Sequence, residues 1–80
     1  MDELQVEQLV VGIVAHMSGI NAQKEHDLLR DIGLDSLSMA ELTIELESQA
    51  NVVFSEMDII GVATVGDLVD LIVKKIQTTP

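Results

Sequence analysis

The sequence predicts a small all-α protein, a four-helix bundle with three longer helices, one short helix and a long first loop. Apolar residues recur at helical spacing in three separate segments of the chain. Hydrophobic residues make up 48% of the 80 residues, which argues against disorder and is enough for one core. Neither internal repeats nor the turn signals that join β-hairpin strands are present. We therefore expect one domain over residues 1–80, with an ordered core of about residues 3–77.

The first helix is predicted from Asp2 to about Met17. Its apolar residues at helical spacing are Val6, Leu9, Val10, Ile13, Val14 and Met17. Asp2 can accept backbone N–H groups at the start of the helix, so it is a suitable N-cap. Ser18 and Gly19 supply the stop, because glycine readily adopts the left-handed conformation that ends many helices.

A connection of about 17 residues follows, from Gly19 to Asp35. A loop of this length in a small domain is usually functional or contains short structure of its own. The segment from Asp27 to Asp31 can form one helical turn. Four apolar side chains are expected to attach the loop to the core: Leu28, Leu29, Ile32 and Leu34.

The second helix is predicted from Ser36 to about Gln49, with Asp35 as its N-cap. The Asp35 carboxylate is expected to accept the backbone N–H of Leu37 or Ser38. The helix carries the carboxylates Glu41, Glu45 and Glu47 and contains no basic residue. Ion pairs within the helix are therefore excluded, and the acidic, partly apolar surface is typical of a site for a protein partner.

The rest of the chain predicts a connector, a short helix and a long one. Ala50 to Ser55 forms the connector, in which residues 52–54 are expected to be a buried anchor. Ser55 and Asp58 have capping-box spacing, and the short helix that they open ends at Gly61.

Thr64 and Asp67 repeat the capping pattern at the start of the last helix. Its apolar row is Val65, Leu68, Val69, Ile72 and Ile76. Lys74 and Lys75 lie in the final turn, where cations complement the helix dipole. Residues 77–80 are expected to fray.

Composition narrows the function classes. The formal net charge is −10, from 14 acidic and 4 basic residues, so a nucleic-acid partner is not expected. Partner proteins are expected to present basic patches. Cysteine is absent, which excludes disulfides and thiolate metal sites from this chain. No apolar run approaches the ~18 residues of a membrane span, and we expect a monomeric, cytoplasmic protein without membrane insertion.

The chemical motifs of common enzymes and metal sites are missing. His16 and His26 are not at ligand spacing, and we expect His16 on the flank of the first helix and His26 in solvent. A calcium-binding loop counted from Asp27 or Asp31 would need a glutamate at position 38 or 42, where Ser38 and Leu42 stand. No metal site is predicted. Ser36 remains, because a hydroxyl at the positive end of a helix is well placed to carry a phosphate ester.

The stretch Asp31-Ile-Gly-Leu-Asp-Ser-Leu37 resembles the attachment motif of the acyl carrier protein family, Asp-Ser-Leu at the start of the second helix. The acidic second helix and the segment Ala63-Thr-Val-Gly-Asp67 also fit that family, as do the helix order, the long first loop and the acidity. The resemblance covers residues 3–77.

The resemblance implies that the chain is a carrier and not an enzyme. Ser36 would be esterified by 4′-phosphopantetheine, which a phosphopantetheinyl transferase takes from coenzyme A, and the thiol of that group would hold acyl groups as thioesters. The chain's partners would be that transferase and acyl-loading, condensing and acyl-transfer enzymes with basic docking patches. The positions that match those used for partner recognition are Asp35, Leu37, Glu41, Ile44 and Glu47.

Departures from the family pattern leave the pathway open. Ser38, Met39, Ala50 and Phe54 differ from the residues common in fatty-acid carriers at these positions. They favour a dedicated carrier for a polyketide or specialised lipid over a housekeeping role in fatty-acid biosynthesis. An aminoacyl or peptidyl carrier of a nonribosomal-peptide or hybrid pathway is the alternative within the family. An unmodified helical interaction module is the alternative outside it.

Overall fold

The computed structural model describes residues 1–78 and contains the expected four helices. They are α1 (Glu3–Ser18), α2 (Ser36–Ala50), α3 (Glu56–Ile60) and α4 (Val65–Thr78). Within these residues the only extended pairing is an isolated bridge between Asp27 and Thr64. The all-α prediction is therefore confirmed, with each helix boundary within a few residues of its predicted place. The predicted fraying of residues 77–80 falls partly outside the described residues, and α4 itself continues through Thr78.

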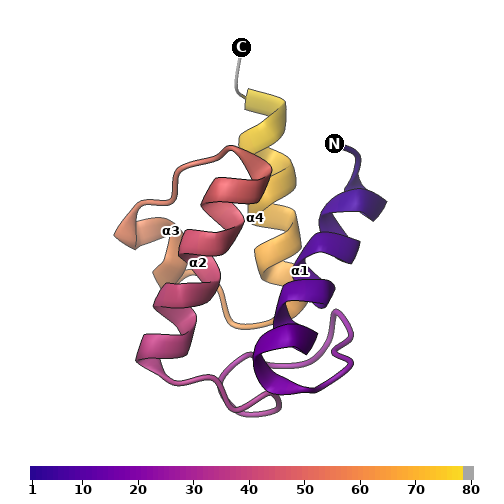
Figure 1. Cartoon of the computed structure of the whole chain (residues 1–80). Coiled ribbons are helices and arrows are strands. Elements are labelled where there is room, and N and C mark those ends of the chain that lie inside the picture. Colours follow the sequence, from indigo (N-terminus) through magenta and orange to yellow (C-terminus); the bar gives the residue numbers. More distant parts are fainter. Residues whose placement is uncertain (79–80) are drawn as a thin grey trace.

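The three longer helices lie side by side, and α1 packs against both α2 and α4. The chain runs along α1, crosses the far end of the bundle in the long first loop, and returns along α2 (Figure 1). The N-terminus and the last turn of α4 lie at the same end, opposite that loop (Figure 1). In residues 1–78 no helix is both long and apolar enough to cross a membrane.

The core is aliphatic and draws on the three longer helices and the first loop. Its buried members are Val6, Val10, Val14, Ala22, Leu28, Ile32, Leu34, Leu42, Leu46, Val65, Leu68, Val69 and Ile72. The rows predicted for the first and last helices thus point inward. Leu29 does not: its side chain is 59% exposed, so the prediction that it attaches the first loop to the core was wrong.

The helix ends follow the capping pattern of the sequence. Asp2 and Gln5 form a capping box at the start of α1, and Gly19 ends that helix with φ of 75°. Ser55 and Asp58 form the expected box at α3. These bonds satisfy N–H groups that the first turn of a helix leaves unpaired, which is why such short sequence signals locate the boundaries.

The first loop has hydrogen-bonded structure of its own. The N–H of Asp31 donates to the carbonyl of Asp27 at 2.9 Å, which closes the predicted single turn. The loop is also bonded to the start of α4, where the N–H of Gly66 donates to the carbonyl of Lys24 at 2.9 Å. A Cβ at Gly66 would lie 3.2 Å from that same carbonyl oxygen, so the close approach favours glycine. The loop therefore holds a defined position beside α4.

An ion pair attaches the short helix α3 to α4. The Nζ of Lys75 lies 2.8 Å from a carboxylate oxygen of Asp58. The hydrogen bond from Lys75, together with the backbone N–H of Ser55, lowers the pKa of Asp58 from 3.8 to about 2. The sequence did not predict this pair, because its partners are 17 residues apart and meet only in the folded chain.

The low pKa of Asp58 gives a testable pH dependence. A carboxyl group whose pKa is lower in the folded state than in the unfolded state stabilises the fold above its ordinary pKa. The contribution of Asp58 should be lost as the pH falls from 3.8 towards about 2. Urea unfolding of wild type and Lys75→Met at about pH 6 and about pH 2 measures this, and the free-energy gap between them should narrow at the lower pH. A gap that is equal at both values would show that the ion pair does not stabilise the fold.

Candidate functional site

Ser36 is the first residue of α2, and its side chain is exposed. The preceding residue, Asp35, is the N-cap, and its carboxylate accepts the backbone N–H of Ser38 at 2.8 Å. That hydrogen bond lowers the pKa of Asp35, so its carboxylate stays ionised beside the hydroxyl. The helix dipole partly offsets this negative charge and favours a phosphate ester at the same position.

The residues before Ser36 hold it in place. Ile32 and Leu34 are buried in the core, and the N–H of Leu34 donates to the carbonyl of Leu28 at 3.0 Å. Between them Gly33 has φ of 85°, a conformation that other residues rarely adopt. The chain is thus anchored immediately before α2, and the hydroxyl projects from a rigid junction between the loop and the helix.

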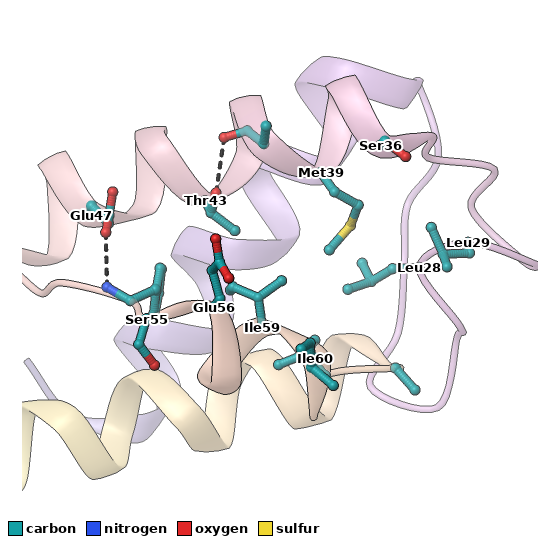
Figure 2. Close-up of a pocket in the computed structure, with 14 residues that line it drawn as sticks. Leu28, Leu29, Ser36, Met39, Thr43, Glu47, Ser55, Glu56, Ile59 and Ile60 are labelled. Carbon is teal, nitrogen blue, oxygen red and sulfur yellow. Dashed lines mark hydrogen bonds between the residues drawn. The ribbon is translucent and has the colours of Figure 1, made fainter.

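Ser36 also lies at the rim of an open cavity of about 790 Å³, which we call the trough. One wall is a single face of α2 formed by Ser36, Met39, Ala40, Thr43 and Glu47. The opposite wall comes from the first loop, α3 and the residues on either side of α3: Leu28, Leu29, Phe54, Ser55, Glu56, Ile59, Ile60, Val62 and Ala63. Figure 2 shows the α2 row running from Ser36 to Glu47, with Ile59 and Ile60 facing it.

The walls of the trough are mostly apolar. The hydroxyl of Thr43 donates to the carbonyl of Ala40 at 2.9 Å, so it is satisfied within α2 (Figure 2). Met39, Ile59 and Ile60 contribute aliphatic surface. An apolar group could therefore move from water into the trough without breaking the hydrogen bond of Thr43.

A second face of α2 lies beside the trough and points into solvent. Leu37 is 69% exposed and Ile44 is 64% exposed, and Glu41 between them is also exposed. Residues four and seven positions after Leu37 share one side of a helix, so these three form one surface. We call it the docking face. With exposed Asp35 at its end, it brings together four of the five residues predicted for partner recognition.

Glu47, the fifth, has a different environment. Its side chain is half-buried, and its Oε2 accepts the backbone N–H of Phe54 at 2.8 Å. The bond crosses from the third turn of α2 after Ser36 to the segment that leads into α3 (Figure 2). Glu47 therefore also lines the trough.

The trough wall across from α2 was not predicted from the sequence. Leu29, Ile59 and Ile60 were interpreted only as loop anchor and short helix, yet they face Ser36 and Met39 across the trough (Figure 2). Their aliphatic character was visible, but the pairing of the two segments depends on tertiary contacts. A signal was present in Met39 and Ala40, which are apolar residues of α2 outside its buried row of Leu42 and Leu46.

The two histidines are not part of the site around Ser36. His16 is exposed near the end of α1, as expected. His26 is half-buried, not in solvent as predicted, because its Nδ1 accepts the N–H of Gln23 at 2.8 Å and stabilises the first loop. Within residues 1–78 no three histidine or acidic side chains are grouped so that they would hold a metal ion.

The chain is similar to known carrier proteins. The family model described as the phosphopantetheine attachment site matches residues 8–72. An acyl carrier protein of Chlorobium phaeobacteroides is 35% identical over 78 residues, covering 94% of this chain and 100% of that protein. The meromycolate extension acyl carrier protein of Mycobacterium leprae is 31% identical and covers 92% of this chain and 70% of that one.

The fold of the chain is also similar to that of acyl carrier proteins. A solved acyl carrier protein from Enterococcus faecalis superposes with a TM-score of 0.82 and 29% identity, over 94% of this chain and 99% of that one. The family model spans most of the chain, and the relative from Chlorobium is matched over its whole length. The exposed serine at the start of α2 is the kind of hydroxyl that such an attachment site needs. The chain therefore belongs to the acyl carrier protein family, whose function depends on a covalently attached phosphopantetheine group.

Proposed function

We propose that the Oγ of Ser36 is the atom that carries phosphopantetheine in this chain. The observation that supports this most strongly is the position of the hydroxyl: it is exposed, begins α2 and lies at the rim of the trough. A phosphate ester at Ser36 fits without displacing a core side chain. Once attached, the group supplies a thiol that holds acyl groups as thioesters.

The chain's own residues then have three tasks. Ser36 anchors the group covalently, and Ile32 and Leu34 keep that anchor rigid from the core side. The trough shelters the acyl group from water between α2 and α3. The hydrophobic effect favours this arrangement, because burying apolar surface gains about 25 cal/mol per Å². The protein in this proposal carries cargo and does not catalyse a reaction on it.

The docking face is proposed to meet the enzymes that act on the cargo. These are the phosphopantetheinyl transferase and acyl-loading, condensing and acyl-transfer enzymes with basic patches. Glu41 and Asp35 would meet arginine and lysine side chains, whereas Leu37 and Ile44 are the apolar contacts. Exposed carboxylates mainly raise the rate of encounter with such patches.

Reversing one charge on the docking face tests this role. Glu41→Lys is expected to lower kcat/KM for modification by a phosphopantetheinyl transferase about tenfold at low salt, because it repels the basic patch. The loss should shrink as salt is added. Thermal stability should change little, because Glu41 is exposed and its carboxylate forms neither a hydrogen bond nor an ion pair within the described residues.

Asp70→Lys is the matched control, since Asp70 is an exposed carboxylate on α4 and the change in charge is the same. It should leave kcat/KM within about threefold of wild type, apart from the general effect of net charge. Equal losses in the two variants would mean that overall charge, and not the docking face, controls the encounter.

The cargo is proposed to be an acyl intermediate of polyketide, specialised-lipid or fatty-acid biosynthesis. The similarity to a carrier named for meromycolate extension supports a lipid cargo. Phe54 is half-buried and lines the trough, at a position where fatty-acid carriers commonly have a smaller residue. This difference supports a cargo that differs from that of the fatty-acid carriers. We further propose a monomer in the cytoplasm, where coenzyme A is available to the transferase.

Mass spectrometry of the intact protein tests the function as a whole. Incubation with coenzyme A and a promiscuous phosphopantetheinyl transferase should add one phosphopantetheine group per chain. With acyl-coenzyme A as donor, the same reaction should add one acylated group. A chain that gains no mass under conditions that modify a known carrier would contradict the proposal.

A further inference from the structure

Glu47 and Phe54 lie at the end of the trough opposite Ser36. Glu47 follows Ser36 by eleven residues, which places it about 16 Å farther along the axis of α2. Both Glu47 and Phe54 line the trough. The hydrogen bond from the Phe54 N–H to Glu47 Oε2, at 2.8 Å, joins its two walls there. Figure 2 shows this bond at one end of the α2 row and Ser36 at the other.

The helix behind that bond depends on polar contacts for its position. α3 has only five residues, Glu56–Ile60, and none of them is buried. Burial of α3's own side chains therefore does little to fix where it lies, although Phe54 and Val62 on either side of it pack partly against the core. The ion pair between Asp58 and Lys75 attaches α3 to α4. The N-cap of α3 is Ser55, and the Glu47 bond attaches the residue before it, Phe54, to α2. The Glu47 bond is thus the direct polar link between the α2 wall and the α3 side of the trough.

We propose that Glu47 is a positioning residue that closes the far end of the trough and so sets the length of acyl group that the carrier shelters. This inference rests on the proposed attachment at Ser36, because the acyl group reaches the trough only on the phosphopantetheine arm attached there. It also changes the role expected of Glu47 from the sequence. Its carboxylate acts on the cargo space through Phe54, while the docking face ends with Ile44.

The first test measures the link itself in the unmodified protein. Hydrogen exchange of the Phe54 amide, followed by NMR, should become about tenfold faster in Glu47→Ala, because the amide loses a charged acceptor. Glu47→Gln should stay close to wild type, since an amide oxygen can still accept the bond. Glu45→Ala is the matched control: it removes the same charge from the same helix, but Glu45 is exposed and does not line the trough.

The second test measures the cargo space. Butyryl, octanoyl and dodecanoyl groups are loaded with a promiscuous transferase, and the melting temperature of each form is recorded. In wild type the gain should level off between octanoyl and dodecanoyl, because the longer chain meets the closed end. In Glu47→Ala the dodecanoyl form should gain about 4 °C over the octanoyl form, whereas Glu47→Gln and Glu45→Ala should repeat the wild-type profile.

Each outcome decides the inference. Unchanged exchange at Phe54 in Glu47→Ala, or a dependence on acyl length that does not change, would overturn it. Glu47→Gln behaving like Glu47→Ala would also overturn it, since charge and not the hydrogen bond would then matter. If the wild-type chain accepts no acyl group at all, the proposed attachment fails and this cargo role fails with it. The exchange rates separate that case, because they are measured without the group.

Discussion

Replacing Ser36 with alanine is expected to abolish attachment of phosphopantetheine. The substitution removes the hydroxyl oxygen proposed as the attachment atom, which lies at the start of α2 and at the rim of the trough. Because Ser36 is exposed, its loss should change the free energy of unfolding by no more than about 0.5 kcal/mol. Intact mass after incubation with coenzyme A and a transferase measures the attachment, and thermal melting verifies that the variant is folded.

Ser38→Ala is the control for this experiment. Ser38 also carries a hydroxyl in the first turn of α2, but it is half-buried and does not line the trough. The variant should still accept one group, at a rate within about threefold of wild type, because the Ser38 backbone N–H that Asp35 binds is retained. If modification persists in the Ser36 variant, or disappears in the Ser38 variant, the result would contradict the assignment of Ser36 as the attachment residue.

Leu42→Ala is expected to cause a large loss of stability. Leu42 lies on the inner side of α2 and has no exposed surface, so truncation removes apolar burial and leaves a cavity. Such changes cost about 2–5 kcal/mol. A domain of this size has about 4–12 kcal/mol in total, so the variant should unfold at much lower urea concentration.

Ile44→Ala provides the comparison within the same helix. Ile44 is two residues away and similar in volume, but its side chain is 64% exposed on the docking face. Its truncation should cost less than about 1 kcal/mol. Equal losses in the two variants would contradict the assignment of one side of α2 to the core and the adjacent side to partners.

The helices could be predicted because their signals are local. Asp2, Ser55 and Gly19 act on backbone groups within four residues of themselves, so a few letters of sequence locate each boundary. The rows of aliphatic residues in α1 and α4 show equally clearly which side faces the core. Ser36 was singled out from its motif and from its place at a helix start, and in the structure it is exposed as the first residue of α2.

Contacts between distant segments could not be predicted in the same way. Leu29 and Ile60 are separated by 31 residues, yet both border the trough. The sequence shows that both residues are apolar, but it does not show that they remain exposed instead of being buried in the core. Glu47 is similar: a carboxylate on an acidic helix suggests a docking residue, and only the position of the Phe54 N–H shows its structural role.

The most direct test of the central claim is to locate the attached group on the chain. Trypsin should release residues 31–74 as one peptide, because Arg30 and Lys74 are the basic residues that bound it. Besides Ser36, this peptide contains the hydroxyl residues Ser38, Thr43, Ser48, Ser55 and Thr64. Fragmentation of the modified peptide should assign one phosphopantetheine to Ser36. The group on any of the other five residues, or its absence from this peptide in a modified protein, would contradict the account.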